Sequence, residues 1–474
     1  MRGIDARFLY SETPTAHMHT LKVAVFDVSG AAGAYSYDEM VTMLSDRLGR
    51  LPPFRQRAVP VPFGLGHPVL IEDPEFALER HVSRRRVQPP GQDRELAGVV
   101  AEVASRPLRR DRPLWELVMV EGLSGGRVAA VAKVHHALAD GTTTVQLLER
   151  ALEPRHLEPQ PDAGEWEPDA VPGDRELLRL AAREQRRRLR ILPNLAARSV
   201  SGLREAQRIR RRSSVKAPLP FDGPRTLFNV SLTPERTFAM TTLDFEDVRA
   251  IRRALDVTVN DVFLGVCGGA VRTFLDRRGE LPIRPLVASV PVATDTATKH
   301  LAGNHVDNLY VSIGTNIADP VERVRRIAEV ATAAKAVRQA LGTELLEERA
   351  EVVPPQLFAL TVRAWSRTHL ANHLRPPINL VVSNVAGPPS RLEVDGAVLE
   401  SLYSVGPILE GIGLNITAWS YAGKLHVSVL GCAASLPDPW PLAYALGGSL
   451  AELRSAVGTP SISKRPAEPT ASTW

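Results

Sequence analysis

Several features are scarce in this sequence of 474 residues, and each scarcity excludes a class of protein. The two cysteines, Cys267 and Cys432, are too few and too far apart for a disulfide framework or a CxxC metal site. Stretches without a charge reach little more than a dozen residues, whereas a membrane-spanning helix needs about 20 apolar residues. The N-terminus lacks the apolar core of a signal peptide. These absences predict a soluble protein of a reducing, cytoplasmic compartment.

Positive charge is concentrated in one segment. The net charge of the whole chain is +5, but residues 174–216 carry 13 Arg and one Lys against four acidic residues, a local charge of +10. Leucines alternate with the arginines, and Pro193 is expected to divide the segment into a pair of helices. The pair would either only connect two domains or contact an anionic lipid surface. Nucleic-acid binding is an alternative, but the segment has no aromatic residues on which bases could stack.

Helix and strand patterns alternate on both sides of this basic segment, which predicts two α/β domains. We expect an N-terminal domain over 1–154, a linker with the basic crossover over 155–218, a C-terminal domain over 219–457 and a disordered tail over 458–474. Ser36 and Glu39 predict a capped helix start, as does Thr258. Asp319-Pro320 predicts the start of another helix.

The GxSxG match at Ser124 is best interpreted as a turn. Segments 117–121 and 127–134 have strand patterns on both sides of it, so Ser124 lies in a hairpin. A nucleophile elbow requires a strand followed by a helix. A nucleophilic Ser124 is therefore not expected.

The segment His135-His136-Ala-Leu-Ala-Asp140-Gly141 follows an apolar strand and precedes a helix pattern. A histidine at such a turn suits general-base chemistry at neutral pH, and Gly141 permits a tight turn. Two other interpretations stay open from the residues alone: buried histidines that are satisfied by the backbone, or metal ligands together with Asp140. Adjacent residues of a strand point to opposite faces, so different roles are expected for His135 and His136.

Further motifs accompany this segment. In chain order they are Asp5–Leu9 with Met18-His19, Pro113-Leu114-Trp115, Thr258-Val-Asn260-Asp261, Ser383-Asn384-Val-Ala-Gly387-Pro388 and Ser420-Tyr421-Ala-Gly423. Together with HHxxxDG they resemble the bacterial wax ester synthase/diacylglycerol acyltransferase family, over nearly the whole chain. HHxxxDG is also found in peptide-synthetase condensation domains, and its combination with the PLW and ND motifs is more specific.

The resemblance implies an α/β (α+β) fold of two chloramphenicol-acetyltransferase-like domains with an active-site tunnel at their interface. His136 would be the general base, His135 would support it, and Asp140 would hold the turn that ends at Gly141. In such enzymes an Arg pairs with the motif Asp. This chain has Ala293-Thr-Asp295 where the family commonly carries that Arg, and Arg225 is the candidate to replace it.

The other motifs would bind substrate or maintain structure. From the residues alone, Pro113, Leu114 and Trp115 would pack between strand and helix. Asn260 and Asp261 would lie in a helix cap, and Ser383 and Asn384 would lie where a strand turns.

The implied reaction is direct transfer of a long-chain acyl group from acyl-CoA to diacylglycerol, and also to long-chain alcohols. The resemblance implies no metal and no cofactor other than acyl-CoA as substrate. It also implies peripheral contact with a membrane or a lipid droplet, and no nucleic-acid partner. Alternatives are an acyltransferase that uses a carrier-protein thioester, a nucleic-acid-binding protein and a catalytically inactive lipid-binding relative.

Overall fold

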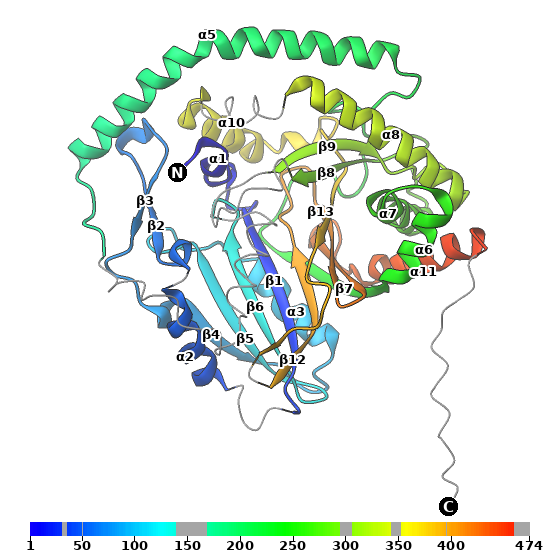
Figure 1. Cartoon of the computed structure of the whole chain (residues 1–474), viewed down its shortest axis with the longest axis horizontal. Coiled ribbons are helices and arrows are strands. Elements are labelled where there is room, and N and C mark those ends of the chain that lie inside the picture. The colour runs from blue at the N-terminus through cyan, green and yellow to red at the C-terminus, as the bar shows by residue number, and fades with distance from the viewer. Residues whose placement is uncertain are drawn as a thin grey trace, which may run out of the picture.

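The computed structural model describes residues 1–30, 36–49, 51–138, 168–293, 306–342, 352–394 and 396–458. Asp140 and Gly141, the helix pattern that follows them and the predicted disordered tail from residue 459 onward lie outside these ranges. Two six-stranded sheets form the centre of the molecule, with the helices around them (Figure 1). The mixed α/β class expected from the sequence is confirmed.

The first sheet has the strand order β11-β12-β1-β6-β5-β4 and is antiparallel except for the β4–β5 pair. Its strands are β1 (His19–Asp27), β4 (Val82–Arg86), β5 (Trp115–Leu123), β6 (Arg127–His135), β11 (Glu393–Val394) and β12 (Ala397–Val405). The accompanying helices are α1 (Gly3–Ser11), α2 (Tyr37–Leu48) and α3 (Asp93–Ala104). A separate hairpin joins β2 (Gln56–Val59) to β3 (Val69–Glu72).

The second sheet has the order β7-β14-β13-β10-β8-β9. Its strands are β7 (Arg236–Asp244), β8 (Val287–Ala293), β9 (Val306–Ser312), β10 (Leu380–Ala386), β13 (Leu414–Tyr421) and β14 (Lys424–Cys432). Its helices are α6 (Phe245–Leu255), α7 (Val259–Asp276), α8 (Pro320–Leu341), α10 (Pro355–Arg367) and α11 (Trp440–Ala456). Short 3-10 turns complete the described chain at Pro52–Phe54, Pro62–Gly64, Leu78–Arg80 and Leu370–Asn372.

One segment from the second half of the chain belongs to the first sheet. Strands β11 and β12 belong to the range 219–457 by sequence, yet β12 pairs with β1 in the first sheet, with Leu21 opposite Val405. The main hydrophobic core accordingly contains residues of both sheets, such as Val23 and Val131 from the first and Leu425 from the second. The sequence-based boundaries do not anticipate this arrangement.

The local signals in the sequence correspond to real helix starts. Ser36 and Glu39 form a reciprocal capping box at the start of α2, and Thr258 and Asp261 form another at α7. Asp319 accepts a hydrogen bond from the backbone N–H of Glu322 at the start of α8. Strands β5 and β6 form the expected hairpin around Ser124. These side-chain caps satisfy backbone donors that would otherwise lack partners.

The basic segment is one helix, so the expected pair of helices is wrong. Helix α5 runs from Asp174 to Arg212 with Pro193 inside it, a length of about 58 Å at 1.5 Å per residue. Figure 1 shows α5 arching over the molecule from the β2–β3 hairpin to α8. Proline removes one helical hydrogen bond and bends a helix without always ending it. Buried residues recur at intervals of seven, namely Ala181, Arg188, Leu195 and Gly202, so one face of α5 is held against the protein along its length.

No single described helix is both long enough and apolar enough to span a membrane. Helices α6 and α7 meet these two criteria only when taken together, and the pair is bent by 107°.

Candidate active site

Strand β6 ends at the two histidines, and neighbouring strands hold their backbone. The N–H of His135 donates to the carbonyl of Leu114 at 2.9 Å, and the N–H of His136 donates to the carbonyl of Met18 at 2.8 Å. The side chains go to different environments, as strand alternation requires. His135 is 1% exposed, whereas His136 is half-buried. The motif therefore presents one buried and one accessible imidazole.

The hydrogen bonds of His135 determine its tautomer. Its Nδ1 accepts the backbone N–H of Ala137 at 3.0 Å, so Nδ1 carries no proton. The proton of the neutral ring is then on Nε2, which lies 3.3 Å from a carboxylate oxygen of Glu12. Burial lowers the pKa of His135 to about 4, although Glu12 opposes that effect. His135 is thus neutral at physiological pH and links Glu12 to the turn that follows His136.

Glu12 connects this histidine to a cation. Burial by itself raises the pKa of Glu12, but the hydrogen bond with His135 and the charge of Arg110 together lower it below its usual value. Arg110 forms an ion pair with the same carboxylate oxygen. The sequence reasoning missed Glu12. Its position between Asp5–Leu9 and Met18-His19, two segments singled out by their motifs, was the available signal.

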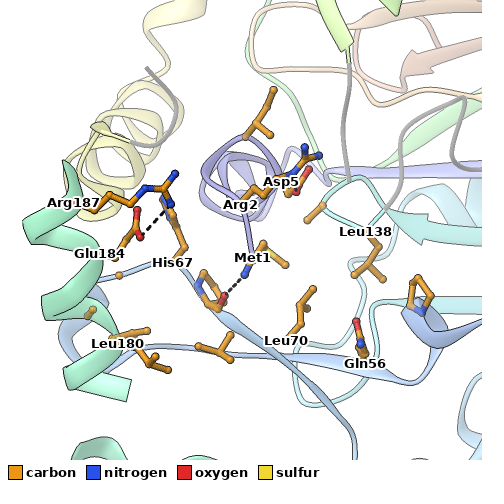
Figure 2. Close-up of a pocket in the computed structure, with 18 of the residues that line it drawn as sticks. Met1, Arg2, Asp5, Gln56, His67, Leu70, Leu138, Leu180, Glu184 and Arg187 are labelled. Carbon is orange, nitrogen blue, oxygen red and sulfur yellow. Dashed lines mark hydrogen bonds and ion pairs between the residues drawn. The ribbon is translucent and has the colours of Figure 1, made fainter. Parts of the chain in front are cut away.

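His136 lies against α1. Its ring stacks on Phe8 with 4.1 Å between centroids and 14° between planes. The next residues, Ala137 and Leu138, line a cavity of about 860 Å³ between α1, the β2–β3 hairpin and α5. Figure 2 shows this cavity, with Leu138 on one side and Glu184 and Arg187 of α5 on the other. The turn after His136 is therefore one wall of a large cavity.

A second cavity of about 950 Å³ lies on another side of this region. Glu12 and Leu114, two of the residues that hydrogen-bond to His135, both line it. Its lining includes basic side chains from two parts of the chain. They are Arg110 from the loop before β5, and Arg363, Arg367 and His369 in or just after α10. Neighbours of the HH pair thus line both cavities, Ala137 the first and Glu12 and Leu114 the second, which suits a reaction that joins two large substrates.

Lys133 is a second buried ion that the sequence reasoning missed. Its ammonium group donates to the carbonyls of Val103 and Arg106 at 2.9 and 2.5 Å, and to Glu116 at 2.9 Å. Burial is the main cause that lowers its pKa, and Glu116 counteracts it. The lysine binds carbonyls at the end of α3, where a cation is favourable. It attaches α3 to β6 two residues before the histidines, and a lone Lys in an apolar strand was the signal for it.

The PLW motif has the packing role expected from the residues. Leu114 and Trp115 are buried, and the indole N–H of Trp115 donates to the carbonyl of Phe54 at 2.7 Å. The Trp115 ring also stacks on His81 at 4.5 Å. Pro113 lies two residues before the start of β5, the strand that these contacts fix. Through the Leu114 carbonyl, the motif also holds the backbone of His135.

The ND and SN motifs lie in the second half of the fold. Asp261 accepts hydrogen bonds from the N–H and hydroxyl of Thr258 at 3.0 and 2.6 Å, and Asn260 is its half-buried neighbour in the first turn of α7. Figure 1 shows α7 on the opposite side of the molecule from α1. Ser383 and Asn384 are half-buried in β10, opposite Thr417 and Ala418 of β13. Both motifs thus belong to elements of the second sheet and its helices.

The predicted roles of Asp140 and Gly141 concern residues outside the described ranges. Arg225, named above as a substitute partner for Asp140, donates to the carbonyl of Leu374 at 3.1 Å. Within the described ranges, no group of three or more His, Cys, Asp or Glu side chains could hold a metal ion. The thiol of Cys267 is buried, which raises its pKa above the range of a reactive nucleophile. Cys267 is therefore not a candidate nucleophile.

Comparison with known proteins agrees with this geometry. Residues 1–263 match the wax ester synthase/diacylglycerol acyltransferase catalytic domain, and residues 302–454 match the WS/DGAT C-terminal domain. The chain is 39% identical to "Putative diacyglycerol O-acyltransferase Rv0221" of Mycobacterium tuberculosis (strain H37Rv), over 97% of this chain and 96% of that protein.

Solved structures show the same relationship. The wax ester synthase/diacylglycerol acyltransferase from Marinobacter aquaeolei VT8 is 26% identical, with a TM-score of 0.64 over 96% of this chain and 98% of that one. The first condensation domain of the CDA synthetase, at 18% identity and a TM-score of 0.55 over 97% and 96% of the two chains, shares the fold alone. Matches to both domains and to relatives over nearly the whole chain confirm the resemblance seen in the motifs: this chain belongs to the wax ester synthase/diacylglycerol acyltransferase family and is an acyltransferase.

Proposed function

We propose that the protein transfers a long-chain acyl group from acyl-CoA to the free hydroxyl of diacylglycerol, and that long-chain alcohols are a second class of acceptor. The observation that carries the proposal is that residues adjacent to or hydrogen-bonded to the histidine pair line two cavities of about 860 and 950 Å³. Each is within the size range of ligand-binding cavities. Two long substrates could therefore approach the same imidazole from different sides.

In the proposed mechanism His136 acts as the general base. It takes the proton of the acceptor hydroxyl while the oxygen attacks the thioester carbonyl. The C–S bond then breaks, and the imidazolium returns the proton to the sulfur of CoA. Acyl-CoA and acceptor become ester and free CoA, with no covalent acyl-enzyme and no cofactor. His135 does not exchange protons in this scheme, because its two nitrogens are already occupied by Ala137 and Glu12.

The cavities differ in a way that supports an assignment of substrates. Arg363 and Arg367 of α10 are exposed at the rim of the second cavity, together with His369. Phosphate groups bind preferentially to such cationic clusters. We therefore assign the CoA end of acyl-CoA to the second cavity and the acceptor to the first. The similarity to condensation domains concerns the fold only and does not favour a carrier-protein thioester.

The substrates imply that the enzyme works at a lipid surface. Diacylglycerol and its product are insoluble in water, and α5 carries a large local excess of arginine on its exposed side. Basic residues near an anionic membrane contribute about 1 kcal/mol each. We propose a cytoplasmic enzyme that associates peripherally with a membrane or a lipid droplet, and no nucleic-acid partner.

The decisive experiment compares wild type with His136→Ala, using labelled palmitoyl-CoA and either diacylglycerol or hexadecanol in detergent. We expect the variant to fold and to lose about 10²–10⁴-fold in turnover. The exposed His373 provides a matched control, since His373→Ala should leave turnover unchanged. Wild-type turnover by His136→Ala would refute the mechanism. Transfer to hexadecanol without transfer to diacylglycerol would refute the proposed main acceptor.

A further inference from the structure

Large apolar side chains gather on one exposed face where three segments of the chain meet. The turn between β2 and β3 exposes Phe63, which is 82% accessible, and Leu65. Helix α10 exposes Leu357 and Leu360, at 57% and 65%. Leu189 of α5 is the fifth exposed residue. Isolated exposed apolar residues are common, but a group of them on one face marks an interaction site.

Hydrogen bonds between the segments show that these residues form one surface. Gln356 of α10 donates to the carbonyl of Phe63, and Gln185 of α5 donates to the carbonyl of Leu65 at 3.0 Å. Leu357 follows Gln356 directly, and Leu189 lies one helical turn after Gln185. The turn is thus attached to a helix on each side, as Figure 1 shows for the hairpin, α5 and α10. We call Phe63, Leu65, Leu189, Leu357 and Leu360 the apolar face.

The backbone at the tip of the turn is strained, and packing does not explain why. Phe63 has a φ of 57°, a left-handed conformation that is costly for a residue with a bulky side chain. The side chain gains little burial in return, since it is mostly exposed. Strain of this kind is a feature of functional sites. Here its effect is to hold a phenyl ring outward at the centre of the apolar face.

The charges around the face select one kind of partner. Arg186, Arg187 and Arg190 lie on α5 beside Leu189, and all three are exposed. Apolar side chains surrounded by arginines match a lipid surface with anionic headgroups, since the first enter the interface and the second bind the headgroups. Phenylalanine and leucine are typical of the inserted side of such surfaces.

The cavity beside the histidine pair lies next to this face. Val61, Gly66 and His67 of the same hairpin line the 860 Å³ cavity, as do Leu180 and Arg187 of α5 (Figure 2). We infer that the apolar face docks on an anionic lipid surface and places this cavity against it, so that the acceptor passes from lipid to His136 without crossing water. This inference rests on the proposed function, because it assigns the source of the lipid acceptor.

The test uses the triple variant Phe63→Ser, Leu357→Ser, Leu360→Ser in the full chain. None of these three side chains is among those that line either cavity. Ile283→Ser is the matched control, because Ile283 is 95% exposed and belongs to a different region of the surface. Binding is measured by sedimentation with vesicles of phosphatidylcholine alone or mixed with phosphatidylglycerol. Turnover is measured on diacylglycerol in the same vesicles and dispersed in detergent.

We expect wild type and Ile283→Ser to bind the anionic vesicles and not the neutral ones. The triple variant should bind about tenfold more weakly or worse, since three apolar side chains are removed. Its turnover should fall on vesicles and stay unchanged in detergent. Equal binding by the triple variant and wild type would overturn the inference. So would an equal loss of turnover in detergent, which would place these residues in the substrate path.

Two further outcomes separate this inference from the proposed function. Wild type could bind anionic vesicles through the apolar face and yet transfer no acyl group in detergent. That result would refute the proposed reaction and the proposed route of the acceptor, but it would support docking of the apolar face on lipid. If wild type binds neither type of vesicle, the docking inference is overturned and the face belongs to a protein contact, whereas transfer in detergent can still support the reaction. His136→Ala should bind vesicles as well as wild type.

Discussion

Replacing Glu12 with Ala tests whether the buried histidine positions the reactive one. The change removes the acceptor of the His135 Nε2–H in a site where His135 is fully buried. An unsatisfied buried donor costs about 1–3 kcal/mol. The lost ion pair with Arg110 adds less than about 1 kcal/mol, because the Arg110 side chain is 44% exposed. We therefore expect the free energy of unfolding to fall by about 1–4 kcal/mol.

The effect on catalysis should exceed what lost stability explains. Without Glu12 the His135 ring can turn and release the N–H of Ala137, the residue after His136. A displacement of about 1 Å at a reacting group can cost about 10²-fold in rate. For Glu12→Ala we expect kcat about 10–100-fold lower at a temperature where the protein is folded. Glu12→Gln retains an acceptor oxygen, so it should recover most of that loss.

The assay is kcat in detergent for Glu12→Ala, His135→Ala and the double variant, with melting curves for each. Coupled residues should give a double variant no slower than the slower single one. Strictly multiplicative losses would mean that Glu12 acts independently of His135. An unchanged kcat in Glu12→Ala would refute the positioning role entirely.

The remaining predictions concern acid stability and the ND motif. Burial lowers the pKa of both His135 and His426 to about 4. Between about pH 4 and 6.5 these two imidazoles therefore stay neutral in the folded protein, whereas in the unfolded chain they bind protons. The free energy of unfolding should therefore fall as pH decreases from about 6.5 to 4, by about 1 kcal/mol per pH unit for each histidine. Denaturant midpoints at several pH values measure this fall, and His426→Gln should reduce its slope. A free energy of unfolding that rises on acidification would contradict the prediction. Asp261→Ala removes the carboxylate half of the capping box of α7 and leaves the N-cap Thr258 in place. It should cost about 0.5–2 kcal/mol while kcat stays the same, with Thr258→Ser as the control that keeps both halves. A selective loss of kcat would instead give Asp261 a role in the reaction.

Local features of the fold were predictable because short-range interactions determine them. The capping boxes at Ser36 and Thr258 join residues three positions apart, and the β5–β6 hairpin joins adjacent segments. The continuity of α5 through Pro193 was not predictable from the local rule for proline. Packing along one whole face of the helix compensates for one missing hydrogen bond.

The active site was predictable in part for the same reason. HHxxxDG is a local pattern, and strand alternation already separated the roles of His135 and His136. Glu12 lies 123 residues from His135 in sequence, and only the pairing of β1 with β6 brings the two segments together. The basic cavity rim likewise combines Arg110 with Arg363 and Arg367 of α10. The periodicity of a sequence does not show which residues far apart in the chain become neighbours in the fold.

The place of strand β12 in the first sheet has a consequence for the order of synthesis. Strand β1 lies between β6 and β12, so until residue 405 has been made one side of β1 has no partner. About 270 residues separate the end of β6 from the end of β12, and translation at about 5–20 residues per second takes roughly 15–50 s to cover them. An unpaired strand edge is a template for aggregation. During that interval the open edge needs a chaperone or another cover, and a chain truncated before residue 405 would expose this edge permanently.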